Sequence, residues 1–162
     1  MNKRIILVGR GGSGKDFLRR TLESRNFKYA VSYTTRPPRE GEIDGVDYFF
    51  INQSKANLMI NRDEFFEYVE FNGWIYGTTR SQWMQENGES VYIMTPTGLS
   101  HVGEEDRKQC FVIYTNPARE IIKERLMGRN MPGDSLERRL EADDKDFENF
   151  SNYDIQITNP DF

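Results

Sequence analysis

A glycine-rich segment near the N-terminus restricts the possible folds more than any other part of the sequence. It runs Gly9-Arg-Gly-Gly-Ser-Gly-Lys-Asp16 and directly follows the apolar residues 5–8. The pattern Gly-x-x-x-x-Gly-Lys-Ser/Thr occurs between a strand and a helix, where backbone N–H groups surround phosphate oxygens and the lysine reaches the terminal phosphates. We therefore predict a nucleotide phosphate loop made of Gly9, Gly11, Gly12, Ser13, Gly14, Lys15 and Asp16.

One position of this loop departs from the pattern. Asp16 stands where a serine or threonine hydroxyl normally binds magnesium. A carboxylate is a hard oxygen ligand that suits Mg²⁺ at least as well as a hydroxyl, directly or through a bound water. The alternative is that the charge of Asp16 only caps the helix N-terminus and lowers the affinity for ATP by repelling phosphate. We favour the first interpretation, in which Asp16 is a metal ligand.

Length and composition exclude several classes of protein. The 162 residues are enough for one domain with its own core and too few for two. A net charge of -4 argues against a general affinity for nucleic acid or anionic membranes. No segment approaches the ~20 apolar residues that span a bilayer, and a single cysteine, Cys110, leaves no internal disulfide. We expect a soluble cytoplasmic protein in which the Cys110 thiol is buried.

Short apolar runs alternate with segments of helical spacing along most of the chain. Continuous apolar runs suit strands that are covered on both faces, as in a parallel sheet with helices on each side. An α/β fold is therefore predicted. The expected strands are Arg4–Val8, Tyr29–Tyr33, Val91–Met94, Cys110–Tyr114 and Ile155–Ile157, and the expected helices are Ala118–Met127 and Ser135–Phe150.

The middle of the chain has a different texture. Ten aromatic residues fall between Tyr48 and Trp83, and residues 66–71 partly alternate between apolar and polar, as in a strand with one solvated face. This texture predicts an inserted subdomain. Farther on, residues 128–133 contain two glycines and a proline, which predicts a mobile loop.

A pair of arginines provides the second constellation. Arg36 and Arg39 lie three residues apart in the segment Ser32-Tyr-Thr-Thr-Arg-Pro-Pro-Arg39, in which the prolines stiffen the backbone. The planar guanidinium fork donates two hydrogen bonds to a phosphate and keeps its charge. Solvated surface arginines are the simple alternative, and the spacing alone is weak evidence. The residues that follow, 40–49, 64–67 and 73–79, strengthen the phosphate interpretation.

In order and spacing, these segments resemble the guanylate kinase family of nucleoside monophosphate (NMP) kinases, from Arg4 to about Asn159. The resemblance implies a P-loop parallel sheet with helices on both faces, an inserted NMP-binding subdomain and a short lid. It implies ATP-dependent phosphorylation of GMP or dGMP with Mg²⁺ as cofactor. The implied parts of this single domain are a core of residues 1–32, 84–127 and 139–162, an NMP-binding subdomain of residues 33–83 and a lid of residues 128–138.

The resemblance also assigns the acceptor site. It implies that the GMP phosphate is bound by Arg36, Arg39, Tyr48 and Tyr76, and that the guanine edge is read by Ser32, Glu67 and Thr78. The chemistry agrees, because a carboxylate accepts hydrogen bonds from both N1–H and the 2-amino group of guanine, and adenine offers no such pair of donors. From the residues alone, Glu67 would be an exposed acid on an alternating strand.

By the same resemblance, lid arginines close over the transferred phosphoryl group, and Arg129 and Arg139 match best. Arg125 and Arg138 are weighted lower, because arginines near a helix C-terminus also cap carbonyl groups. The implied catalytic set is Lys15, Arg39, Arg129 and Arg139, and Asn159 is placed near the adenine of ATP. No general base is needed, since the acceptor phosphate is largely ionised at neutral pH, with a second pKa of about 6.

The sequence departs from the family in two further respects. The family normally carries an acidic residue near the nucleotides on the strand matched by residues 91–94, and here Ile93, Met94 and Thr95 occupy that region. We expect Asp16 to compensate, and we interpret Asp143, Asp144 and Asp146 as a solvated helix face. The family also adds a helix after the strand at 155–157. The shorter chain predicts either a minimal version of the fold or a sheet edge covered by another subunit, as in a homodimer.

Three alternatives stay open from the sequence. A ribose bisphosphate phosphokinase shares the Gly-Lys-Asp loop and the altered second strand, but it does not require the complete acceptor set. A relaxed deoxynucleoside monophosphate kinase fits the same residues. A guanylate-kinase-like binding module without catalysis is disfavoured, because such a module has no use for Lys15 and its glycines.

Overall fold

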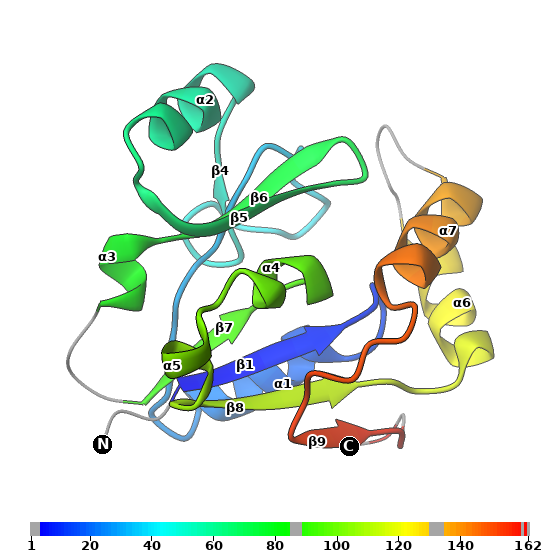
Figure 1. Cartoon of the computed structure of the whole chain (residues 1–162). Coiled ribbons are helices and arrows are strands. Elements are labelled where there is room, and N and C mark those ends of the chain that lie inside the picture. The colour runs from blue at the N-terminus through cyan, green and yellow to red at the C-terminus, as the bar shows by residue number, and fades with distance from the viewer. Residues whose placement is uncertain (1–3, 85–88, 130–134, 160, 162) are drawn as a thin grey trace.

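A parallel five-stranded sheet forms the core of the protein. The structure is a computed structural model, which describes residues 4–84, 89–129, 135–159 and 161. The strand order is β2-β7-β1-β8-β9, and all neighbouring strands are parallel. The strands are β1 (Arg4–Gly9), β2 (Lys28–Tyr29), β7 (Ser90–Ile93), β8 (Cys110–Thr115) and β9 (Ile155–Ile157). The predicted α/β architecture is confirmed (Figure 1).

Helices cover both faces of this sheet because successive side chains of a strand point to opposite sides. On one face, Leu7 and Ile113 pack against Leu18 and Leu22 of helix α1 (Lys15–Glu23). The other face, which includes Ile6, is covered by α4 (Pro96–Ser100), α5 (Glu104–Arg107) and the end of α7 (Leu136–Asp146). Helix α6 (Arg119–Met127) packs on α7 beside the sheet. The sheet therefore holds the phosphate loop, which joins β1 to α1, at its carboxyl edge.

A smaller sheet stands over this carboxyl edge (Figure 1). Its order is β4-β3-β6-β5, and it is mixed, since β3 pairs parallel to β4 and antiparallel to β6. Its strands are β3 (Tyr33–Thr34), β4 (Phe49–Phe50), β5 (Phe65–Phe71) and β6 (Trp74–Thr79), accompanied by α2 (Gln53–Asn61) and α3 (Arg80–Trp83). The expected inserted subdomain corresponds to this unit.

The structure corrects the expected strand at Tyr29–Tyr33. The chain leaves the core sheet after β2 and enters the mixed sheet at β3, so the apolar run belongs to two sheets. Its ends make different pairs, because the Ala30 N–H donates to the Val91 carbonyl, whereas the Ser32 carbonyl accepts from the Phe49 N–H. A run of apolar residues reports burial along its length and does not show that the buried segment changes partner.

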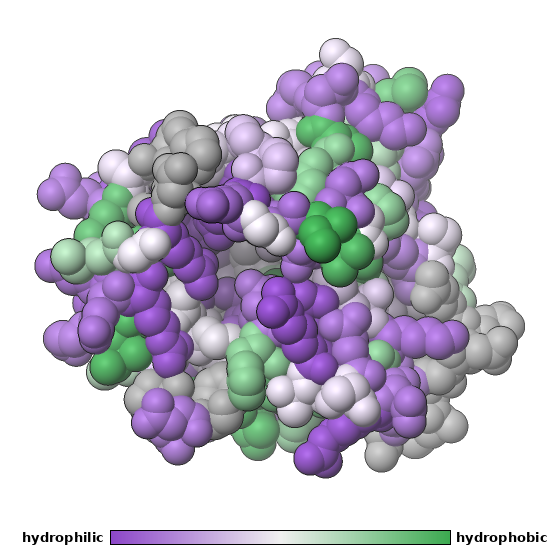
Figure 2. Space-filling view, turned by 180° about the vertical axis from the view of Figure 1, so that it is seen from behind, coloured by the Kyte–Doolittle hydropathy of each residue, from purple (hydrophilic) through white to green (hydrophobic). Residues whose placement is uncertain are grey.

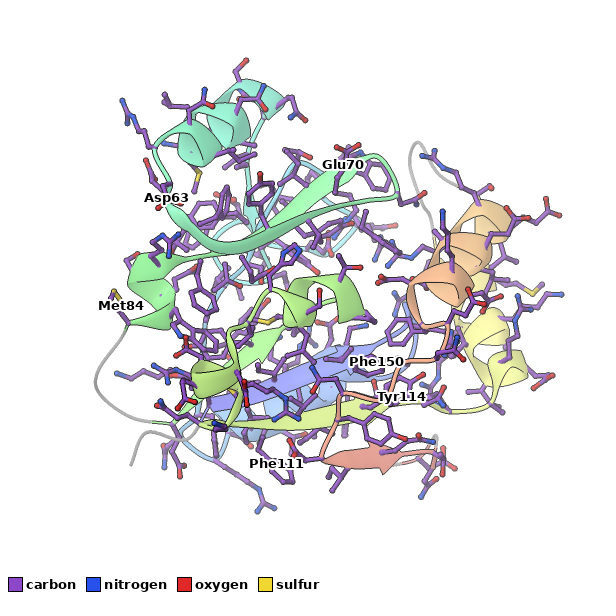
Figure 3. All side chains as sticks on the ribbon, viewed as in Figure 1. Asp63, Glu70, Met84, Phe111, Tyr114 and Phe150 are labelled. Atoms are coloured by element: carbon purple, nitrogen blue, oxygen red, sulfur yellow. The ribbon has the colours of Figure 1, made fainter. Side chains whose placement is uncertain are left out.

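The last helix is also shorter than expected. Helix α7 ends at Asp146, and the residues after it form an aromatic cluster instead of another helical turn. The rings of Tyr114 and Phe147 stack with centroids 5.4 Å apart, and Phe150 meets Tyr114 edge-on at 5.1 Å. Figure 3 shows Tyr114 and Phe150 close together at the end of β8. Of the expected lid, residues 130–134 lie outside the described part of the chain.

The surface and the cysteine agree with the composition. Seen from the back, the molecule is mostly hydrophilic, with apolar residues scattered among charged ones (Figure 2). The Cys110 thiol is buried, as expected, and burial raises its pKa to about 11. Among the helices that the structure describes, none combines the length and the hydrophobicity needed to span a bilayer.

Candidate functional site

A cleft between the two sheets is lined by residues of the phosphate loop and of the predicted acceptor site. From the core it is lined by Gly9, Lys15 and Thr95, from the mixed sheet and its loops by Ser32, Tyr48, Glu67 and Tyr76, and from α7 by Arg139, Asp143 and Asp146. A further cavity of about 730 Å³ is lined by Asp16, Arg39, Glu40, Glu42, Gly128 and Arg129. The phosphate loop and the arginine segment therefore face shared space.

The phosphate loop has the geometry that its glycines predict. Gly12 and Gly14 have positive φ angles of 77° and 99°, a region that favours glycine, and Gly14 is the residue before α1. At Gly9 a side chain would overlap the Ser13 and Thr115 hydroxyls, which hydrogen-bond to each other at 2.7 Å. These contacts fix the loop against the end of β8. The N-terminus of helix α1, which follows the loop, faces the cleft.

Lys15 is the basic group at the base of the loop. Its ammonium group donates to the carbonyl oxygens of Gly9 and Arg10, the latter at 2.9 Å. Burial lowers the pKa of Lys15 to about 8, opposed by the nearby charges of Asp143 and Asp16. The amine thus lies in a desolvated place between carboxylates, where an added phosphate would favour its charged form.

The first arginine of the pair is buried and held by a carboxylate. Arg36 is 4% exposed, and its two terminal nitrogens donate to the two carboxylate oxygens of Glu42 at 3.0 and 2.8 Å. The guanidinium lies over the Tyr48 ring, 5.2 Å from its centroid. The Arg39 backbone N–H also donates to Glu42, at 2.6 Å. The interpretation of Arg36 as a solvated surface residue is therefore wrong.

Sequence reasoning missed the role of Glu42. A buried guanidinium needs a paired acceptor, and Glu42 is the acid that the turn after the two prolines brings back to Arg36. The hydrogen bonds to Arg36 and Arg39 outweigh burial and lower the pKa of Glu42. A requirement that each buried arginine have a nearby acid would have drawn attention to this residue.

The three predicted guanine-reading residues are all buried. Ser32 is 5% exposed, Glu67 6% and Thr78 0%. Burial raises the pKa of Glu67 to about 7, and the neighbouring Thr78 opposes this rise. A side chain at Gly98 would come within 2.7 Å of the Glu67 carboxylate, so glycine lets α4 approach this acid. The alternative of an exposed acid is wrong.

Helix α7 brings a further pair of charges to the loop. Arg139 lies with its guanidinium 5.2 Å from the Phe71 ring centroid, and its Nε is 3.5 Å from Asp143 Oδ2. The same carboxylate oxygen accepts a hydrogen bond from the Gly11 N–H at 3.1 Å, and Asp143 is 3% exposed. The interpretation as a solvated helix face is therefore wrong for Asp143. The helix carries Asp143 inward because it lies on the same stripe as Leu140 and Phe147.

Asp144 and Asp146 contact other partners. Asp144 pairs with Arg119 at 2.6 Å, outside the cleft. Asp146 accepts from the Thr97 hydroxyl at 2.8 Å, and burial raises its pKa. Asp144 also reaches the loop, because its Oδ1 lies 3.5 Å from Arg10 Nε. Asp143 is the acid that accepts a hydrogen bond from a loop glycine.

The remaining arginines of this region contact different parts of the site. Arg125 donates to the Gly12 carbonyl at 3.0 Å, so it contacts the phosphate loop, although its expected role is weighted below that of Arg129 and Arg139. Arg138 donates to the Asn72 carbonyl at 3.2 Å and so links α7 to the turn between β5 and β6. Arg129 lines the cavity that also contains Asp16 and Arg39. Asn159 lines neither cavity; its side chain accepts from the Asp161 N–H at 3.0 Å.

The oxygen donors near the loop fit a magnesium ion held largely by nucleotide phosphates. Mg²⁺ is usually bound by one or two carboxylates together with substrate phosphates and water. Asp16 is well exposed at the cavity, with 69% of its side chain accessible. Asp16 and Asp143 both lie near enough to Lys15 to raise its pKa. Within the described ranges, no group of three potential ligands forms a complete protein-only metal site.

Comparisons with known proteins agree on one family. A family model described as guanylate kinase matches residues 1–162. A guanylate kinase from Nostoc sp. is 34% identical over 166 aligned positions, which cover 99% of this chain and 83% of that protein. A crystal structure of guanylate kinase from Anaplasma phagocytophilum superposes with a TM-score of 0.73 at 22% identity, over 99% of this chain and 78% of that one.

Proposed function

The chain belongs to the guanylate kinase family, and we propose that its cleft carries out the ATP-dependent phosphorylation of GMP to GDP. The observation that carries this proposal is the placement of Glu67 and Lys15 in one cleft. Glu67 is a buried hydrogen-bond acceptor suited to guanine, and Lys15 belongs to a loop suited to phosphate. A base-reading pocket and a phosphoryl-donor loop that share one space fit transfer between two nucleotides.

On the donor side, the loop amides and Lys15 bind the ATP phosphates. Phosphoryl transfer requires positioning and charge neutralisation more than covalent help from the protein. Arg139 and Arg129 approach the same region from α7 and from the start of the lid, so they stabilise the transferred group. Asp16, together with the nucleotide phosphates, would hold Mg²⁺, which would neutralise charge on the phosphates. Asn159 keeps only its sequence-based assignment to the adenine.

On the acceptor side, Arg39 and the two tyrosines bind the GMP phosphate beside Arg36. Both terminal nitrogens of Arg36 already donate hydrogen bonds to Glu42. Arg36 therefore also fixes the shape of the loop that presents Arg39. Ser32, Glu67 and Thr78 hold the base. The ionised acceptor phosphate attacks without a general base. Because these residues contact the base and phosphate and none is assigned to the ribose, we expect dGMP to be accepted as well.

The division of the chain follows from this scheme. The core 1–32, 84–127 and 139–162 binds ATP, residues 33–83 bind GMP, and 128–138 form the lid. We also propose a cytoplasmic location, from the reduced Cys110 and the absence of charge complementarity to membranes. The homodimer stays a prediction from the sequence.

The substrate range tests the proposed function directly. In an assay that couples ADP release to a signal, we expect ATP consumption with GMP and dGMP, and turnover at least about 10²-fold lower with AMP, TMP or ribose bisphosphate. A site built to accept two hydrogen bonds from guanine leaves Glu67 unpaired with the others. GMP binding without ADP release would instead support a non-catalytic module.

The metal assignment has its own test in Asp16→Ala. If Asp16 ligates Mg²⁺, the magnesium concentration that gives half-maximal turnover should rise by about tenfold or more. Glu120→Ala is the matched control, because Glu120 is also an exposed acid in the first turn of a helix and lines neither of the two cavities. An unchanged magnesium dependence in Asp16→Ala would leave this residue with a capping role only.

A further inference from the structure

The carboxylate of Asp143 lies where the phosphate loop would receive an anion. Asp143 Oδ2 accepts the Gly11 N–H at 3.1 Å, and that N–H belongs to the loop whose amides surround phosphate. The same oxygen is 3.5 Å from Arg139 Nε. In this arrangement an internal acid is bonded to one amide of the donor site and paired with one of its cations.

Among the described residues that line the cleft, Asp143 is the carboxylate that accepts a hydrogen bond from a phosphate-loop amide. The end of β7 contributes Ile93, Met94 and Thr95 to the lining, and these carry no acid. Glu67 lies beside Thr78 on the mixed sheet. Asp146 accepts the Thr97 hydroxyl with its Oδ1 oxygen. Besides the exposed Asp16, Asp143 is therefore the carboxylate that a bound triphosphate would meet at the loop.

A buried carboxylate next to a triphosphate has a predictable electrostatic effect. Asp143 is 3% exposed, so water screens its charge poorly. A metal-free triphosphate would displace it from Gly11, draw Arg139 away and leave an unpaired buried charge beside its own negative charges. A divalent cation between the phosphates and the carboxylate removes that repulsion, because Mg²⁺ takes one or two carboxylates together with phosphate oxygens.

Building on the proposed use of ATP, we propose that Asp143 makes binding of the donor nucleotide conditional on a divalent cation. The residue supplies from α7 an acid that the end of β7 lacks. Its charge lowers the affinity for the metal-free triphosphate, whereas it does not repel the metal-bound form. Because α7 follows the lid, the same residue links the state of the donor site to the position of Arg139.

The test compares ATP binding with and without magnesium by isothermal titration calorimetry, which needs no turnover. For the wild-type chain we expect Mg²⁺ to tighten ATP binding. In Asp143→Asn this coupling should fall by about tenfold, within the usual 5- to 150-fold range for coupled ligands, mainly because metal-free ATP binds more tightly. Glu141→Gln removes a charge from an exposed position of α7 and should leave the coupling unchanged.

An unchanged coupling in Asp143→Asn would overturn the proposal. If ATP and Mg-ATP both bound more weakly by the same factor, the coupling would be unchanged, and Asp143 would only hold the loop and Arg139 together. Asp143→Ser, with thermal melting of each variant, covers the case in which the asparagine variant does not fold. Failure of the proposed function is separate, since it would show as absent GMP phosphorylation in the wild-type chain with the metal coupling intact.

Discussion

Replacing Lys15 with methionine is expected to lower turnover with ATP and GMP by about 10³-fold. One preorganised donor aimed at developing charge contributes about 10²–10³ in rate, and Lys15 adds a full charge in a desolvated place. Its pKa of about 8 in the free protein means that the amine is mostly charged at neutral pH, and bound phosphate increases that charged fraction. The measurement is steady-state ADP release at saturating nucleotide.

The control for this variant separates chemistry from folding. Lys15 also donates to the Gly9 and Arg10 carbonyls, so its loss removes two contacts that hold the loop. GMP binding by calorimetry should be retained in Lys15→Met, because the acceptor residues lie on another unit. Lys123→Met removes an exposed lysine from α6 and should keep full activity. A Lys15→Met enzyme within tenfold of wild type would contradict the assignment of the loop.

The phosphate loop was predictable because its signal is local. The glycines, the lysine and the preceding apolar residues occupy adjacent positions, and the backbone angles at Gly12 and Gly14 follow from residue type. The arginine pair was equally visible, yet its burial was not. Burial of Arg36 depends on Glu42 and on the rings of Tyr48 and Phe50, which the turn after the prolines brings around the guanidinium.

Asp143 shows why the remainder of the site was missed. Its partner Gly11 is 132 positions away in the chain, so no local pattern pairs them. An acidic run on a helix also looks like a solvated face by composition. The missed signal is spacing, since Leu136, Leu140, Asp143 and Phe147 follow the i, i+4, i+7, i+11 pattern of a buried stripe. A charged residue on such a stripe indicates a buried functional acid or a buried pair.

Glu67 carries the same lesson in a strand and leads to the second large effect. It lies between Phe65 and Val69 on the buried face of β5, where alternation predicts an apolar residue. Replacing it with glutamine should lower kcat/KM for GMP by about 10²-fold or more, because the amide presents a donor to the donors of guanine. Glu70→Gln, on the exposed face of the same strand near the hairpin end (Figure 3), should change little.

The pH dependence gives this assignment a second, independent readout. Burial raises the pKa of the Glu67 carboxyl from its ordinary value of 4.5 to about 7. The Glu67 carboxyl must be ionised to accept the hydrogen bonds of guanine. Below pH 7, GMP binding therefore competes with protonation of Glu67 and releases its proton. The KM for GMP should rise by up to about tenfold for each pH unit below 7, beyond the contribution of the substrate phosphate.

The same shift has the opposite consequence for folding. An acid whose pKa is higher in the folded protein binds more protons there than in the unfolded chain between pH 4.5 and 7. The contribution of Glu67 to the free energy of unfolding therefore falls as the pH rises through that range, and it stays low at higher pH. Glu67→Gln should remove both trends. We expect the variant to be more stable than wild type at pH 8. Its GMP affinity should not depend on pH, except through the titration of the GMP phosphate. A GMP affinity in Glu67→Gln that keeps the full wild-type pH profile would mean that another group reads the base.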